Sequence, residues 1–172
     1  MSGMRLRLSG TEQGLTTHVS TQISGAESPE LVRESLINIF PDFPHLEGIE
    51  PTFPSNNHKV WEASNISLAN YLDIIHEQRI LDTALDAMSK RIDGDTTEFY
   101  LSRQASIKGK VAFPVGENNE LGGVIIVRIS GPNLVQWLEA ATWHDGRETI
   151  PRSIGDELAM TESDDPVTWI QD

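Results

Sequence analysis

The residues best suited to ligand chemistry lie in one cationic run between positions 100 and 113. This run holds Arg103, Lys108 and Lys110 and no acid, whereas the whole chain has 26 acidic and 13 basic residues and a formal charge of −13. Guanidinium and ammonium groups are the usual contacts of nucleic-acid phosphates, and amide and hydroxyl groups also contact the backbone. The run therefore indicates either an RNA contact or a solvated polar surface.

Other reactive residues form no recognisable site. The five histidines are scattered without metal-ligand spacing. The segment HEQRI at 76–80 begins like a zinc-protease helix but lacks a second histidine four residues on. The segment 116–123 lacks the lysine and hydroxyl residue of a phosphate-binding loop. We expect a non-catalytic protein without metal or cofactor, although a catalytic pair assembled only by the fold would leave no trace in the sequence.

Length and composition favour one cytoplasmic domain with two tails. The 172 residues suit a single core, and the absence of cysteine excludes disulfides, thiolate metal sites and cysteine nucleophiles. No apolar run reaches the roughly 20 residues of a membrane helix, and no secretory signal opens the chain. We expect a flexible arm at 1–15, one domain at 16–145 and an acidic tail at 146–172.

The acidity has two interpretations: the surface either repels nucleic acid and favours a basic partner, or reflects the composition of the whole proteome. The chain has only four lysines against nine arginines, and its acids are spread along most of the sequence. A surface rich in carboxylates and poor in lysine resembles the surfaces of proteins from extreme halophiles. Molar salt screens charges within about 3 Å, so the net charge indicates little about partners.

Hydrophobic periodicity predicts an α+β fold. Ser28 and Pro29 form a typical helix start, and Gly94 lies in a segment that ends a long amphipathic helix. We predict strands at 18–24, 58–64, 97–102, 105–113 and 122–130, and helices at 28–40, 67–75, 77–92 and 132–141. The order β-α-β-α-α-β-β-β-α indicates a two-layer sandwich with a mainly antiparallel sheet covered by helices on one face.

The cationic run itself alternates with the period of a strand. Apolar residues and Gly109 occupy odd positions from 105 to 113, and Gln104, Ser106, Lys108 and Lys110 occupy even positions. If this strand pairs with 122–130, Arg128 joins the two lysines on an uncovered sheet face. The pattern then predicts a small cationic patch with amide and hydroxyl donors.

Three motifs occur in order along the chain: NIFP at 38–41, QRILDTA at 78–84 and LSRQASIKGKVAF at 101–113. With them, residues from about 17 to 145 resemble an archaeal family of small uncharacterised proteins described as RNA-binding proteins or predicted exosome subunits. The acidic tails resemble additions of a haloarchaeal member. Ser102 and Arg103 stand where the family pattern has Asn and Lys, so a role for that Asn does not transfer. Genes of this family often lie beside the gene for dephospho-coenzyme A kinase, but this position does not indicate that the chain binds the coenzyme.

The resemblance implies the two-layer α+β fold of the ribosomal large-subunit protein that binds the smallest ribosomal RNA. It also implies RNA as a partner, in RNA processing or ribosome-linked work. We expect a non-catalytic protein whose RNA contacts come from a set of polar residues: Arg79, Arg103, Gln104, Ser106, Lys108, Lys110 and Arg128. The alternative is a protein-interaction module that uses the same open sheet face in a homodimer or with an RNA-processing partner.

Overall fold

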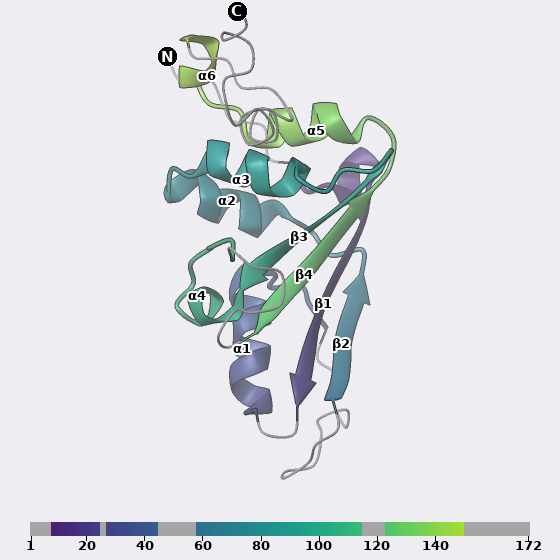
Figure 1. The fold of residues 1–172 in the computed structure, drawn as a ribbon, viewed down its shortest axis with the longest axis vertical. Helices are drawn as coiled ribbons and strands as arrows, with labels where there is room; N and C mark the ends of the chain where they lie inside the picture. The colour runs from purple at the N-terminus through teal and green to yellow at the C-terminus, as the bar shows by residue number, and fades with distance from the viewer. Residues whose placement is uncertain (1–7, 25–26, 45–57, 115–122, 150–172) are drawn as a thin grey trace, which may run out of the picture.

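A computed structural model of the chain describes residues 8–24, 27–44, 58–114 and 123–149. It has two layers, a four-stranded antiparallel sheet and a set of helices that lie on one side of it (Figure 1). The predicted α+β class is confirmed. Among the described residues, no helix is long and apolar enough to cross a membrane.

The sheet has the strand order β2-β1-β4-β3. Its strands are β1 (Thr16–Ser24), β2 (His58–Ser64), β3 (Thr96–Ser102) and β4 (Val124–Ser130). Val127 lies opposite Val19 on one side and Phe99 on the other, so the apolar positions of β1, β4 and β3 are in register. Because side chains alternate along a strand, the apolar side chains of these three strands all point toward the helices.

The helices are α1 (Pro29–Ile39), α2 (Ala69–Glu77), α3 (Leu81–Ser89) and α5 (Leu134–Ala141), with short helices η1 (Thr11–Gln13), α4 (Arg103–Ile107) and α6 (Gly146–Thr149). Helix α1 begins as predicted, since the Ser28 hydroxyl accepts a hydrogen bond from the Leu31 N–H and Pro29 needs no donor. Its buried face includes Val32 and Leu36.

The core lies between the inner face of the sheet and the helices. Its fully buried large side chains include Trp61, Phe40, Phe99, Leu85 and Met88. Each such burial contributes roughly 1.5–3 kcal/mol relative to an exposed side chain. Leu15, in the expected N-terminal arm, belongs to this core, and Arg147, in the expected acidic tail, is buried through polar contacts with Thr142 and Asp82. Residues 1–7 and 150–172 lie outside the described residues.

The predicted strand at 105–113 is wrong. Residues Arg103–Ile107 form helix α4, and the chain then turns at Gly109, whose φ of 73° suits glycine. The Ser102 hydroxyl starts this helix by accepting a hydrogen bond from the Ala105 N–H at 3.3 Å. The period-2 pattern does not match the burial of this segment, because Ser106 at an even position and Val111 at an odd position are both buried.

Tyr71 occupies the centre of the helix–sheet interface. Its ring lies 6.3 Å from that of Phe40 and 5.7 Å from that of Phe99, centroid to centroid. Its hydroxyl is buried and has no hydrogen-bond partner among the described residues. Burial therefore raises the pKa of Tyr71, and the hydroxyl adds a desolvation cost that no contact in this part of the chain offsets.

We expect Tyr71→Phe to leave the free energy of unfolding unchanged or to raise it by about 1 kcal/mol, because it removes an unpaired buried hydroxyl. Tyr100→Phe is the matched control, since the Tyr100 hydroxyl donates to Glu98 at 3.2 Å and its removal should cost a little stability. Chemical denaturation followed by circular dichroism measures both. A clear loss of stability in Tyr71→Phe would show that its hydroxyl has a partner.

Candidate functional site

The seven residues predicted to contact RNA separate into three environments. Arg103 and Ser106 are buried. Arg79, Gln104, Lys108 and Lys110 are exposed on turns and on a short helix in the helix layer, and Arg128 is exposed on the opposite face of the sheet. The predicted patch of Lys108, Lys110 and Arg128 on one sheet face is therefore wrong, because α4 replaces the strand that would have aligned them.

Arg103 is a structural residue in this fold. Its side chain is only 5% exposed and forms an ion pair with Glu27. Its Nη1 donates to the Gln22 carbonyl at 2.9 Å and to Thr21 Oγ1 at 3.3 Å. A buried cation needs such partners to offset its lost hydration. The guanidinium therefore holds the start of α4 to β1 and is not available to a phosphate.

Gly123 makes room for this guanidinium. A Cβ atom at position 123 would lie 2.1 Å from Arg103 Nη2, and the φ of Gly123 is +83°. The Gly123 carbonyl also accepts a hydrogen bond from the Arg103 N–H at 3.2 Å. The glycine thus fixes where β4 begins relative to α4.

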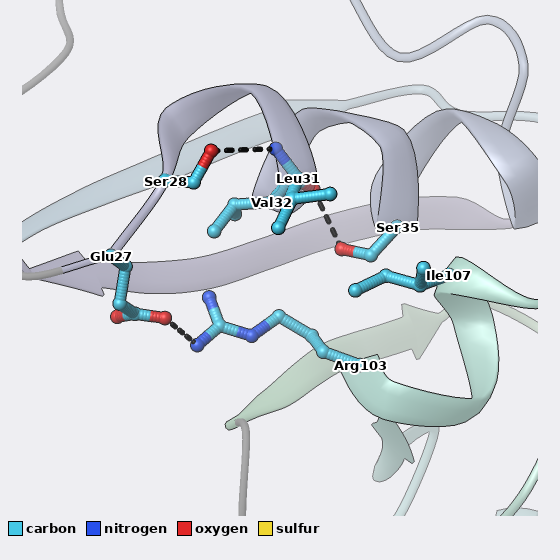
Figure 2. Close-up of a pocket in the computed structure, with 7 residues that line it drawn as sticks. All are labelled: Glu27, Ser28, Leu31, Val32, Ser35, Arg103 and Ile107. Carbon is cyan, nitrogen blue, oxygen red and sulfur yellow. Dashed lines mark hydrogen bonds and ion pairs between the residues drawn. The ribbon is translucent and has the colours of Figure 1, made fainter.

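A pocket of about 190 Å³ lies between α1 and α4, with the Arg103 side chain along one wall (Figure 2). The Ser28 hydroxyl there accepts from Leu31, and the Ser35 hydroxyl donates to the Val32 carbonyl at 2.6 Å. The remaining wall is aliphatic and includes Ile107. Its polar groups are thus engaged within the fold, as Figure 2 shows, and the pocket offers no evident anion site.

Ser106 is also removed from the predicted surface. Its hydroxyl donates to the Ser102 carbonyl at 3.0 Å inside α4. The helix packs against α1, and the Asn38 amide of α1 donates to the carbonyls of Ser106 at 2.9 Å and Ile107 at 3.1 Å. Asn38 therefore satisfies the Ile107 carbonyl at the end of α4 and shares the Ser106 carbonyl with the Gly109 N–H, which donates to it at 2.9 Å.

A second amide holds the segment after α4. Gln78 follows α2, and its Nε2 donates to the Val111 carbonyl at 3.0 Å while its Oε1 accepts from the Val111 N–H at 2.8 Å. The Lys110 N–H donates to the Ala105 carbonyl at 3.0 Å. Both amides belong to the motifs found in the sequence, and nothing in the spacing of those motifs indicates that they meet at one turn.

These bonds bring two exposed turns together, and we call Arg79, Gln104, Lys108 and Lys110 the basic turn cluster. Arg79 follows Gln78, and Lys110 precedes Val111. The bonds between the Gln78 side chain and the Val111 backbone therefore hold the turn of Arg79 beside the turn of Lys110. Arg79 has a φ of 59°, which is uncommon for a residue with a side chain. Among the described residues, none of the three cations of the cluster forms an ion pair.

The other face of the sheet carries a different set of groups, and we call it the open sheet face. Its acidic side chains, Glu62 and Glu98, each contact a neighbouring His or Arg side chain. Arg128 Nη2 donates to Glu98 Oε2 at 2.8 Å, and His18 Nε2 lies 3.0 Å from Glu62 Oε1. Around them, the face consists of hydroxyl, amide, aliphatic and phenol side chains of the four strands: Ser20, Gln22, Val60, Ser64, Val124, Ile126 and Tyr100.

A third polar group joins α6 to the start of α3. Asp82 Oδ1 accepts from Arg147 Nη2 at 2.6 Å and lies 3.0 Å from His144 Nε2. Burial alone raises the pKa of Asp82, but the hydrogen bonds from Arg147 and His144 outweigh it, so the pKa lies below its ordinary value. In the part of the chain that the structure describes, no three potential metal ligands gather.

Comparisons with known proteins show the same fold and several relatives. No family model matches the chain. A UPF0201 protein of Aeropyrum pernix is 29% identical over 141 residues, which cover 78% of this chain and 91% of that protein. A UPF0201 protein of Methanothermobacter thermautotrophicus is 23% identical over 141 residues, which cover 80% of this chain and 96% of that protein.

Two solved structures extend the comparison. The crystal structure of a UPF0201 protein from Methanococcus jannaschii aligns with a TM-score of 0.62 at 21% identity, covering 74% of this chain and 99% of that one. The crystal structure of an uncharacterised UPF0201 protein aligns with a TM-score of 0.59 at 25% identity, covering 72% of this chain and 90% of that one.

We expect Gln78→Ala to free the turn after α4. The change leaves the buried Val111 N–H without its partner, which costs about 1–3 kcal/mol. Hydrogen exchange should therefore accelerate at Val111 more than in the sheet. Gln104→Ala is the matched control, because Gln104 is exposed on α4. Equal exchange at Val111 in the wild type and Gln78→Ala would contradict this role.

We expect Asp82→Asn to reduce the acid sensitivity of the fold. Because the folded pKa is lowered, the carboxylate stabilises the fold above its unfolded pKa of about 3.9, and this contribution is lost as the pH falls through the folded pKa. The melting temperatures of the wild type and Asp82→Asn should thus differ near neutral pH and converge in acid. The control is Asp145→Asn, an exposed acid. A constant difference at all pH values would contradict the assignment.

Proposed function

The chain is related to the UPF0201 family of archaeal proteins, and on this premise we propose that it is a non-catalytic protein that binds the RNA backbone through the basic turn cluster. The observation that carries the proposal is the presence of three exposed cations, Arg79, Lys108 and Lys110, on turns joined by one amide pair. Cations that are not neutralised by neighbouring acids are free to contact phosphates.

The charge of the rest of the molecule makes this cluster distinctive. Arg103, Arg128 and Arg147 each form an ion pair with an acid. Arg33 lies over the Trp61 ring and Arg91 over the Tyr100 ring. The net charge of −13 repels RNA at long range, so attraction has to act at short range, where the cluster presents its side chains.

The way the turns are held also supports binding. Asn38 and Gln78 fix the backbone on both sides of Lys108 and Lys110, which lowers the entropy lost when a ligand is bound. Gln104 lies on the exposed side of α4 and adds uncharged donors and an acceptor. Such groups contact sugar hydroxyls, which distinguish RNA from DNA, and they are less weakened by salt than ion pairs are. The acidic, lysine-poor surface is consistent with a protein that works in concentrated salt.

The test is the double substitution Lys108→Glu and Lys110→Glu. We expect RNA affinity to fall at least about tenfold at moderate salt, because two phosphate contacts become repulsive. The slope of log affinity against log salt should also fall by about 1.4 for a single strand, which corresponds to two lost contacts. Fluorescence anisotropy with labelled single-stranded and hairpin RNA, from low to molar salt, measures both values.

The matched control is Lys90→Glu. Lys90 is exposed after α3, forms no ion pair with a described residue and lies outside the cluster. Its reversal changes the net charge equally per site and should leave most of the affinity intact. Equal losses in Lys90→Glu and in a single Lys108→Glu variant would indicate a general charge effect. RNA binding that survives the double substitution with the fold intact would remove the cluster from the proposal.

A further inference from the structure

The helix layer leaves the open sheet face without a cover in the described part of the chain. Helices α1 to α4 lie on the other side of the sheet (Figure 1). Val60 of the edge strand β2 is 54% exposed, and Ile126 and Val124 of β4 are half-buried on this face. An antiparallel sheet tolerates one solvated face, but exposed aliphatic groups on it favour contact with another protein surface.

The charges on this face have a self-complementary arrangement. Glu62 lies on β2 and Arg128 on β4, so the two strands flank β1 and stand roughly 10 Å apart. The Arg128 side chain is 60% exposed and that of Glu62 is 58% exposed. Within the described residues, Arg128 uses Nη2 toward Glu98, and Glu62 uses Oε1 toward His18. Each therefore keeps further donors or an acceptor oriented to solvent.

We propose that the open sheet face binds a second copy of this chain. The twofold axis lies parallel to the sheet, passes above β1 between His18 and Ser20, and runs perpendicular to the line from Glu62 to Arg128. Such an axis exchanges the positions of Glu62 and Arg128, so Arg128 of each copy meets Glu62 of the other. One isologous contact then forms two ion pairs. The same association removes part of the exposed Val60 and Ile126 surface from water. This contact is independent of RNA binding, which uses the helix layer.

The charges favour a second copy over RNA on this face. Glu98 lies against Arg128, and Glu62 lies against His18, so an acid that repels phosphate stands beside each of these two side chains, while Arg91 lies over the Tyr100 ring. A surface that carries both signs instead fits a second copy of itself where an acid of one copy meets a base of the other. The face measures roughly 20 Å by 20 Å, on the order of 400 Å² per copy, from the strand spacing and rise. Stable interfaces bury about 800 Å² per partner, so the dimer is weak.

The experiment is sedimentation velocity of the full chain over a roughly hundredfold range of concentration that extends to the high micromolar range. We expect a concentration-dependent dimer in the wild type. Glu62→Arg and Arg128→Glu should each raise its dissociation constant at least about tenfold, because like charges then meet across the axis. The combined exchange of both residues should restore association, since the pairs form again with reversed sign.

Two further variants make the result decisive. Glu77→Arg is the matched control, because Glu77 is exposed on α2 and its reversal should leave the dimer unchanged. Val60→Asp should weaken the dimer while leaving the fold intact, since Val60 is exposed. A strict monomer overturns the proposal, as does a dimer that resists both single reversals. Failure of the double exchange to restore association, with circular dichroism showing a folded chain, also overturns it. RNA binding that is lost in Arg128→Glu of a monomeric protein would assign the face to RNA.

Discussion

The burial of the Arg103 guanidinium fixes how β1, the end of β3, the start of α4 and the entry to α1 meet. A charge taken out of water must be paired and hydrogen-bonded, and Arg103 meets this need with Glu27, Thr21 and the Gln22 carbonyl. These partners lie before α1 and on β1, 76 to 82 positions earlier in the chain. Arg103 therefore joins β1 to the end of β3, the start of α4 and the entry to α1.

The surface divides its basic groups by their surroundings. In the helix layer, backbone turns held by amides present Arg79, Lys108 and Lys110 to solvent without acid partners among the described residues. On the sheet, Arg128 stands beside Glu98. The same residue types thus have different surroundings on the two layers: cations without acid partners suit a polyanion, and cations beside acids suit a protein surface. Net charge alone conceals this difference.

Local sequence signals predict most of the helices and strands. The features that they miss depend on contacts between residues far apart in the chain. Ser28 and Pro29 start α1 as expected, and the alternation in β1 places Val19 and Ile23 in the core. The segment 105–113 misleads because Ser102 caps a single helical turn and Gly109 ends it, both within a period-2 pattern. The burial of Arg103 could not be predicted from the sequence, because its partner Glu27 lies 76 residues away in the chain. The exposure of Lys108 and Lys110 on turns depends on Asn38 and Gln78, which act from separate helices.

The glycine at position 123 restricts which substitutions related proteins can accept there. Arg103 occupies the volume that any Cβ atom there would need. A change at 123 therefore demands a shorter or redirected side chain at 103, and that change in turn leaves the carboxylate of Glu27 without its guanidinium. We therefore expect positions 27, 103 and 123 to vary together among related sequences. Their joint variation would record how the entry to α1 is held, separately from selection on any ligand.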